Sequence, residues 1–509
     1  MHAATPLPAP GSPAERAEFE RLQARLPQLF DEIFRDQLTP RTVVVVPGLS
    51  LDPDVLGKID GVQHYEERML SMLMLLRLPN LRLLFLSSEP ISGVTIDYYL
   101  HLLGGVPPMH ARKRLFLFSP HDGSPQSLTR KLLSRPRLLA RVRAAIENPA
   151  TAHLSVFNST CDEVSLAVAL GIPMYACDPE LGYWGGKSGS RRAFREAGIS
   201  LPPGAEDLRD LEDAAEAIAV LRSQIPDLRR VVLKIDQGFS GDGNALLNLP
   251  QAPGKLPLST IRQLLQSQLQ PEANDTDACQ FAQLYQRQGG IVEAWIEGKG
   301  KRTPSVQARI NPLGGIELIS SHEQLMGGRS GQVFLGSQFP ASAEYARQLH
   351  PLAVRVGEVL RERGVIGRFS VDFISVPTAD GWQHHAIEIN LRKGGTTLPY
   401  QMLQFLTDGN YCAETAQFIT PSGLVRCYHA TDNLVNPDYR RLIPHDLVDL
   451  IVQHRLHFDQ TRQRGAVFSL IGALSRYGKL GLVSIDETPQ AATAQFEQVR
   501  ALLDHQARL

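Results

Sequence analysis

Two carboxylates and an amide, at Asp372, Glu388 and Asn390, are the side chains of this sequence best suited to chemistry. They lie in the stretch GRFSVDFISVPTADGWQHHAIEINLRKGGTTLP, where apolar residues flank both acids. Buried acids need a nearby cation to stay charged. Carboxylate and amide oxygens are ligands for a partly hydrated Mg²⁺ (or Mn²⁺) ion, which keeps room for phosphate oxygens. These residues therefore predict a metal site that faces a phosphate.

A cationic, glycine-rich turn follows the three residues directly. It reads Arg392-Lys393-Gly394-Gly395-Thr396-Thr397. Positive charge and free backbone N–H groups beside a metal site suit an anion such as an acyl phosphate or a terminal phosphate. The turn is therefore a second candidate for contact with a phosphorylated group.

The elements that position these residues are predicted to be two strands, Phe369–Ser375 and Trp382–Asn390, joined by the turn PTADG. Because side chains alternate along a strand, Glu388 and Asn390 lie on one face and Ile389 on the other. An ordinary hairpin with solvated acids is the alternative. The EIN triplet followed by RKGG favours the metal site.

A buried lysine precedes a glycine-rich loop further upstream. Lys234 lies within the apolar segment VVLKID, where an ammonium group is unfavourable unless it meets an anion. The loop DQGFSGDGN follows, and its glycines allow the backbone to close on phosphates. The same letters also fit a β-hairpin turn. The loop residues of interest are Gly238, Ser240, Gly241 and Gly243.

Two further segments are candidates for ligand contacts. The strand GIVEAWIEG carries Glu293 among apolar residues and offers an apolar edge to an adenine ring. The segment SSHEQLMGGRSG is predicted to line an acceptor pocket with Arg309 nearby, although a structural loop with a satisfied His322 is the alternative. Its polar residues are His322, Glu323, Gln324 and Arg329.

Composition limits the classes of function. The chain has 509 residues, enough for two or three domains with large cores. Its formal net charge is −1, so no basic field indicates a nucleic-acid partner. The most apolar run, Met69–Leu78, is too short to span a bilayer and contains Arg77. We therefore expect neither a nucleic acid nor a membrane as partner.

Cysteine usage and the first residues predict a cytoplasmic location. The five cysteines are scattered and form no CxxC pair, which favours reduced thiols over disulfides or zinc. The start of the chain, MHAATPLPAPGSPAER, lacks the apolar region of a secretory signal. We expect residues 1–15 to be a disordered leader.

Strand-like and helical segments alternate in residues 16–182, which predicts a parallel sheet covered by helices on both faces. No GxGxxG fingerprint follows the first strand. The five apolar runs are Thr42–Val46, Leu81–Ser87, Leu115–Ser119, His153–Phe157 and Ile172–Cys177. Residues 183–419 carry the candidate site residues, and residues 420–509 have helices and one strand-like segment of their own.

The order of the motifs resembles the ATP-grasp superfamily over residues 183–410: GKSGSR, VLK with the glycine-rich loop, IVEAWIEG, VDF and EIN. Four strings, KSGSRRAFREAG, SSHEQLMGGRSGQVFLGSQFPA, EINLRKGGTTLP and YEERML, resemble the pheganomycin-type peptide ligases. This resemblance implies an α/β and α+β fold. A Rossmann-like pre-ATP-grasp domain would precede the ATP-grasp core, and a small C-terminal domain would follow it.

The resemblance also implies a role for each matching residue. Lys187 and Lys234 would contact ATP phosphates, under the loop that holds Ser240 and its glycine neighbours. Glu293, with the backbone of Ala294 and Ile296, would hold the adenine, and Glu297 is a candidate for the ribose. Two Mg²⁺ ions would bind Asp372, Glu388 and Asn390. Arg392 and the turn Gly394–Gly395 would face the phosphoryl acceptor.

The activity implied is ATP-dependent ligation of a carboxylate to an amine through an acyl phosphate, with release of ADP and phosphate. Lys187, Lys234 and Arg392 would neutralise charge. The substrates would be small molecules, amino acids or peptides, and a homodimer is implied by analogy. Two alternatives stay open: a kinase-type phosphotransferase, and a nucleotide-binding regulatory protein without turnover.

Overall fold

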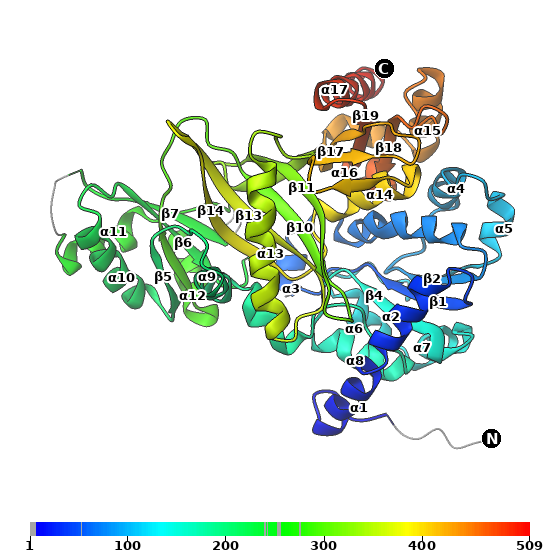
Figure 1. The fold of residues 1–509 in the computed structure, drawn as a ribbon, viewed down its shortest axis with the longest axis horizontal. Coiled ribbons are helices and arrows are strands. Elements are labelled where there is room, and N and C mark those ends of the chain that lie inside the picture. The colour runs from blue at the N-terminus through cyan, green and yellow to red at the C-terminus, as the bar shows by residue number, and fades with distance from the viewer. Residues whose placement is uncertain (1–6, 52, 239–240, 242, 252–255, 274–275) are drawn as a thin grey trace.

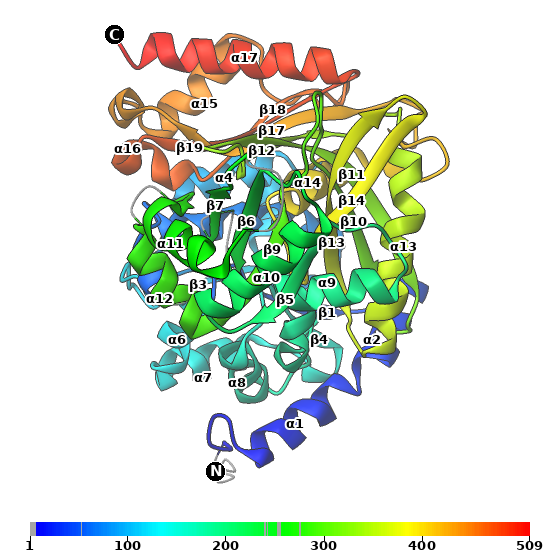
Figure 2. The same cartoon turned by 90° about the vertical axis from the view of Figure 1, so that its left-hand side faces the viewer.

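The computed structural model describes residues 7–51, 53–238, 241, 243–251, 256–273 and 276–509 (Figure 1). These residues form a parallel N-terminal sheet, a five-stranded sheet in a lobe at the left of Figure 1, and a long sheet between the two. Helices α1 (Pro13–Gln23) and α17 (Pro489–Gln506) lie at opposite ends of the molecule in both views (Figures 1 and 2). None of the helices in these ranges is long and apolar enough to cross a membrane.

The N-terminal sheet has the order β3-β2-β1-β4, and all its strand pairs are parallel. Apolar side chains from both faces are buried, so the predicted parallel sheet is confirmed. The fifth apolar run, Ile172–Cys177, does not form a strand of this sheet. It makes only an isolated bridge between Leu154 and Met174, because Pro173 has no backbone N–H to donate. The strands are β1 Arg41–Val46, β2 Leu81–Leu86, β3 Leu115–Phe118 and β4 Ala152–Val156.

Short helices cover this sheet. The segment before β2 is a 3₁₀ helix, η1 (Val62–Arg77), in which residues 66–74 and 76 are buried. Residues 128–145 form two helices that are divided before Pro136, whose ring disfavours helix continuation. The helices are α1, α2 Leu26–Arg35, α3 Pro53–Leu56, α4 Gly93–His101, α5 Pro108–Arg112, α6 Leu128–Leu133, α7 Pro136–Ala145 and α8 Cys161–Leu170.

The lobe contains an antiparallel sheet of order β5-β9-β6-β7-β8, with helices packed on one core. Its strand β6 (Arg230–Ile235) contains Lys234 and is followed in the chain by the glycine-rich segment. The other elements are β5 Gly204–Leu208, β7 Asn244–Asn248, β8 Gln270–Pro271, β9 Gly290–Ala294, α10 Leu211–Gln224, α11 Leu258–Gln268 and α12 Ala278–Gln288. Helix α9 (Lys187–Glu196) lies beside this lobe (Figure 2).

The long sheet has the order β14-β13-β10-β11-β12-β17-β19-β18. Helix α13 (Ala346–Glu362) packs its buried side chains against strands β10 and β11. The central strands are β10 Pro304–Ile310, β11 Ile316–Gly327, β12 Val333–Phe339, β13 Gly367–Thr378 and β14 Gly381–Asn390. Helix α14 (Thr397–Thr407) follows the cationic turn, and the small hairpin β15 (Asn410–Cys412) and β16 (Gln417–Ile419) comes next.

The C-terminal strands continue the long sheet instead of forming one of their own. Ser337 of β12 pairs with Ala430 of β17, so the sheet is unbroken across the predicted boundary at residue 420. That boundary and the one near residue 183 stay predictions. The elements are β17 Cys427–Val435, β18 Gly465–Ser469, β19 Lys479–Asp486, α15 Pro444–Gln453, α16 Leu474–Tyr477 and α17.

The register of three neighbouring strands brings the candidate metal ligands together. Asp372 of β13 lies opposite Glu388 of β14 and opposite Ser305 of β10. Asn390 faces Ser370 two residue pairs further along, on the same face of the sheet. Ile389 is completely buried in the core on the other face, as alternation along the strand predicts.

Candidate functional site

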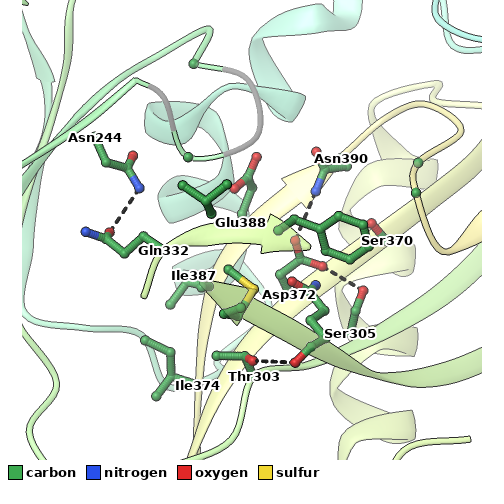
Figure 3. Close-up of a pocket in the computed structure, with 18 of the residues that line it drawn as sticks. Asn244, Thr303, Ser305, Gln332, Ser370, Asp372, Ile374, Ile387, Glu388 and Asn390 are labelled. Atoms are coloured by element: carbon green, nitrogen blue, oxygen red, sulfur yellow. Dashed lines mark hydrogen bonds between the residues drawn. The ribbon is translucent and has the colours of Figure 1, made fainter. Parts of the chain in front are cut away.

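A cavity of about 320 Å³ lies where the lobe, the long sheet and the N-terminal segment meet. Figure 3 shows Asp372, Glu388 and Asn390 close together on its wall, Asp372 in the middle of strand β13 and the other two at the end of β14. Lys187 and Lys234 line it from the lobe side. The cavity therefore collects the acids and the lysines that the sequence singled out.

Asp372 is held by two neighbours. The Ser305 hydroxyl donates a hydrogen bond to Oδ1 of Asp372 at 2.6 Å, and Nδ2 of Asn390 donates to Oδ2 at 3.2 Å. Burial and the charge of Glu388 raise the pKa of Asp372 to about 6. A cation between the two acids would remove this repulsion.

Glu388 is paired with a lysine. Nζ of Lys187, the first residue of helix α9, lies 2.6 Å from Oε1 of Glu388. Burial opposes ionisation of Glu388, but the charges of Lys187, Lys234 and Arg392 outweigh it and hold the pKa below its usual range. Glu388 is therefore charged and Asp372 titrates close to neutrality, although the two face each other.

A second buried ion cluster lies deeper in the lobe. Glu293 accepts from Nζ of Lys234 at 2.7 Å and from Nη1 of Arg191 at 2.5 Å. The Glu293 and Arg191 side chains are each only 2% exposed. Both oxygens of Glu293 thus hold cations, one of which reaches the cavity. The predicted contact of Glu293 with adenine stays a prediction.

Gly238 and Gly241 of the glycine-rich segment line this part of the cavity. Gly238 and Gly243 pack against each other, and a Cβ on Gly243 would lie 2.7 Å from Cα of Gly238. Gly241 has φ +87°, and its Cβ would lie 2.5 Å from the Gln332 carbonyl oxygen. Ser240 lies outside the described residues. The glycines are therefore required by the close approach of backbone to backbone.

Trp295 and its neighbours form the apolar end of the cavity. Ala294, Trp295 and Ile296 line the wall, as expected for an adenine-binding edge. Nζ of Lys301 lies 4.3 Å from the centre of the Trp295 ring. Glu297, the candidate ribose ligand, instead pairs with Arg230 at 3.0 Å outside the cavity lining.

The cationic turn reaches the cavity from the other side. Arg392, Gly394 and Gly395 all line it, and a Cβ on Gly395 would lie 2.6 Å from the Phe334 ring. Burial lowers the pKa of Arg392, while Glu388 and Asp372 act against this. The guanidinium group therefore belongs to the same charge network as the two acids.

The segment predicted to line an acceptor pocket reaches the cavity at Gln324, Met326 and Gly331, and of its four polar candidates Gln324 alone is in the lining. His322 is buried among aromatic rings, bonded through Nε2 to the Tyr428 hydroxyl at 2.7 Å, and burial lowers its pKa to about 3. Glu323 accepts from the Tyr345 hydroxyl, and Arg329 contacts the Pro271 carbonyl at 3.5 Å. This environment fits the structural alternative for His322.

Arg309 lies outside this cavity. It pairs with Glu317 and lines a second, separate cavity beside the N-terminal sheet. Its predicted catalytic role is therefore not supported by proximity to the metal-binding residues, and it stays a prediction.

Sequence reasoning missed an arginine from the N-terminal segment. Arg68 of η1 stacks between the rings of Tyr65 and Phe157, at 4.5 and 4.8 Å from their centres, and its Nη1 lies 2.7 Å from Asp432. Its buried Nη2 has no hydrogen-bond partner in the described part of the chain. The string YEERML contains Arg68, so the sequence indicated that this segment matters. It did not indicate that Arg68 lines the cavity.

The acids fit a metal that arrives with phosphates. Within the described ranges, no three His, Cys, Asp or Glu side chains gather as a metal-binding group. Asp372, Glu388 and the amide of Asn390 supply only part of a coordination shell. Mg²⁺ usually keeps water and phosphate oxygens as its other ligands, so the donor set suits a Mg-nucleotide.

Comparison with known families agrees with this geometry. A family model described as "IQCH-like, ATP-grasp" matches residues 180–276 and 258–413. The chain contains an ATP-grasp domain. A model described as "PGM1 C-terminal domain" matches residues 446–498, beyond the ATP-grasp part.

Two curated relatives align with most of the chain. IQ motif-containing protein H from Danio rerio is 25% identical over 508 residues, which cover 90% of this chain and 48% of the relative. The chain therefore spans about half the length of that ATP-grasp relative. L-propargylglycine–L-glutamate ligase from Streptantibioticus cattleyicolor is 26% identical over 476 residues, which cover 91% of this chain and 94% of the ligase.

Solved ATP-grasp structures share the fold. The ADP complex of N5-carboxyaminoimidazole ribonucleotide synthetase superposes with a TM-score of 0.52 at 13% identity, covering 92% of this chain and 98% of that one. The biotin carboxylase domain of 2-oxoglutarate carboxylase from Hydrogenobacter thermophilus gives 0.56 at 12% identity, covering 90% and 89%. The predicted fold, an ATP-grasp core preceded by a parallel α/β sheet, is confirmed.

Proposed function

We propose that this ATP-grasp chain is an ATP-dependent carboxylate–amine ligase that forms an amide or peptide bond and releases ADP and phosphate. The observation that carries the proposal is the single cavity in which two acids, two lysines and a cationic glycine turn meet. Similarity to L-propargylglycine–L-glutamate ligase over most of both chains supports it.

The nucleotide would lie between the lobe and the long sheet. Its adenine would pack on the edge formed by Ala294, Trp295 and Ile296. Lys187 and Lys234 would contact the phosphates, and the loop with Gly238, Gly241 and Gly243 would cover them. Because Glu388 and Glu293 hold these lysines, each ammonium group is positioned before the nucleotide binds.

Asp372, Glu388 and Asn390 would hold Mg²⁺, which neutralises the charge of the triphosphate when bound. Arg392 and the backbone N–H groups of the turn 394–395 would face the oxygens of the transferred phosphoryl group. The pair Lys187–Glu388 would then exchange partners, with Lys187 turning to phosphate. Catalysis would rest on position and charge, with no nucleophilic side chain.

The reaction has two steps. An oxygen of the substrate carboxylate attacks the γ-phosphorus of ATP, the bond to the β-phosphate oxygen breaks, and an acyl phosphate and ADP form. The amine then attacks the acyl carbon, and the tetrahedral intermediate expels inorganic phosphate and loses a proton. Cations around the cavity would stabilise both negatively charged transition states.

The substrates we propose are small carboxylic acids and amines of the amino acid or peptide class. The name of the relative described above says that it joins L-propargylglycine to L-glutamate. This supports amino acids as the class of substrate for the present chain, but it does not identify the individual compounds. We also propose that the enzyme works in the cytoplasm, since all five cysteines are free thiols in the structure. Assembly as a homodimer remains a proposal that size-exclusion chromatography with light scattering would test.

A direct test uses Mg-ATP, pooled organic and amino acids, and hydroxylamine as a small amine. Acid-dependent hydroxamate together with ADP and phosphate is the expected result. ADP with a stable phosphorylated product and no hydroxamate would instead favour the kinase-type alternative. Nucleotide binding without any turnover would contradict the ligase proposal and favour a regulatory protein.

A further inference from the structure

A second cavity of about 270 Å³ lies beside the first, between the end of strand β4 and the long sheet. Four cationic side chains line it: Arg309, Arg368, Arg392 and Lys393. None of the described residues that line it is an aspartate or a glutamate. The cavity therefore has a strongly positive interior.

Two polar atoms of this cavity are buried without a partner. Nη1 of Arg368 is inaccessible to solvent and has no hydrogen-bond partner in the described part of the chain, and the same holds for Nδ1 of His153. Arg368 makes no salt bridge to a described acid, whereas Arg309 pairs with Glu317. A buried guanidinium without an anion is unfavourable, so the structure lacks a counter-charge here.

Lys393 strengthens this imbalance. Its Nζ donates to the Val156 carbonyl and lies 3.4 Å from the Ser155 hydroxyl, while its backbone N–H donates to the Phe157 carbonyl at 3.1 Å. Burial, followed by the charge of Arg368, lowers the pKa of Lys393 to about 7. Burial also lowers the pKa of Arg368 to about 10. An anion would reverse both effects.

The second cavity adjoins the first. Arg392 and Phe157 line both, so the wall between them is made by these two residues. The lining also includes the apolar residues Met72, Leu75 and Phe405. The volume lies near the lower end of the roughly 300–1,000 Å³ that small-molecule sites occupy. A short molecule with a charged end and an apolar stem fits these features.

We propose that the second cavity binds the carboxylate of the amine substrate, with Arg368 as its main ligand. The amine would then point past Arg392 towards the acyl phosphate in the first cavity. This assignment rests on the proposed ligase function, but the anion site itself does not. It selects amines that carry a carboxylate, such as amino acids, over amines without one.

The site is tested by binding without nucleotide. Isothermal titration calorimetry with L-glutamate at low ionic strength should give saturable binding to the wild-type protein, and Arg368→Gln should weaken it by at least about tenfold. Arg363→Gln is the control, because Arg363 pairs with Glu196 on the surface, away from this cavity. If Arg368→Gln does not fold, Lys393→Met must show the same loss.

Two results would overturn the site: no binding of L-glutamate to the wild-type protein, or equal affinity in the wild type and the folded variants. Inorganic phosphate is the second probe, since it shares the anionic chemistry. Phosphate that binds in an Arg368-dependent manner while L-glutamate does not would contradict the carboxylate assignment.

A kinetic experiment separates the site from the ligase proposal. Hydroxylamine has no carboxylate, so in Arg368→Gln the ratio of KM for L-glutamate to KM for hydroxylamine should rise by at least about tenfold. An unchanged ratio would overturn the link to the amine substrate. If the protein binds L-glutamate through Arg368 but does not turn over ATP, the ligase proposal is wrong and the proposal of an anion site is supported.

Discussion

The two adjoining cavities differ in how their charges are balanced. In the first, Lys187 faces Glu388 at 2.6 Å and Lys234 faces Glu293 at 2.7 Å. In the second, Arg368 and Lys393 have no acidic partner among the described residues. The first cavity thus supplies its own counter-ions, and the second depends on a ligand to supply one.

This difference indicates two ways to prepare a site for an anion. In the first cavity, each lysine is already held by an acid and must exchange it for phosphate, which fixes the geometry in advance. In the second, cations are buried beforehand, and their mutual repulsion favours whichever anion fits. Arg392 belongs to both networks because it lines both cavities.

The largest effect is expected from removal of an acid of the first cavity. Glu388→Ala should lower ATP turnover by at least about 10³-fold, because Lys187 and the metal both lose their ligand. ADP release measures the rate, and circular dichroism checks the fold. Glu358→Ala, at an exposed position of α13, is the matched control. Wild-type turnover in Glu388→Ala would refute the metal assignment.

The two cations bound to Glu293 allow a sharper comparison. Lys234 lines the cavity and Arg191 does not. Lys234→Gln should weaken Mg-ATP binding by about 10²-fold, whereas Arg191→Gln should lower the melting temperature with a much smaller effect on affinity. Fluorescence titration and thermal unfolding measure the two quantities. Equal losses of affinity in both variants would show that Lys234 acts through the fold.

The pH dependence of stability should have opposite signs in the two cavities. The pKa of Asp372 is raised to about 6, so its contribution to stability is present below the unfolded value near 3.8 and is lost as pH rises through 6. Burial lowers the pKa of His153 to about 4, so its contribution is present above about 6.5 and is lost as pH falls.

Urea unfolding without metal or nucleotide tests this between pH 4 and 6.5. Asp372→Asn should make the loss of stability on acidification steeper, and His153→Asn should make it shallower, each by at most about 1.4 kcal/mol per pH unit. Identical slopes in the two variants would contradict the assigned environments.

The smallest effect is expected for Arg309, whose charge is already matched by Glu317. Arg309→Gln should weaken L-glutamate binding by about threefold, less than Arg368→Gln does, because only a balanced cation is removed. Calorimetry on both variants measures the order. The reverse order would mean that pairing with Glu317 does not determine affinity in the second cavity.

The sequence predicted the first cavity well because local rules determine it. Strand alternation places Glu388 and Asn390 together, and a lysine inside an apolar strand implies a buried anion, which is Glu293. The parallel N-terminal sheet followed from apolar runs. Each of these inferences depends either on the alternation of side chains along a strand or on the free-energy cost of burying one charge.

Other residues could not be assigned because their positions depend on distant segments. Arg68 reaches the first cavity from a 3₁₀ helix more than a hundred residues before Lys187 in the chain. The sequence assigned no function to Arg368. Its place in the second cavity depends on strand β4, which lies far away in the chain. His322 was a candidate because histidine is a common active-site residue. In the structure it is surrounded by aromatic residues of β12, α14 and β17, which the sequence could not place beside it.

The unbroken long sheet has a consequence for any attempt to divide this protein. The ATP-grasp match ends at residue 413, but β12 forms its outer hydrogen bonds with β17, further along the chain. A fragment that stops at the end of the match would expose the backbone edge of β12 over residues 337–339. Exposed edges pair with one another, so we expect such a fragment to associate with itself or precipitate. We therefore expect the residues after 420 to protect the ATP-grasp part of the chain from aggregation.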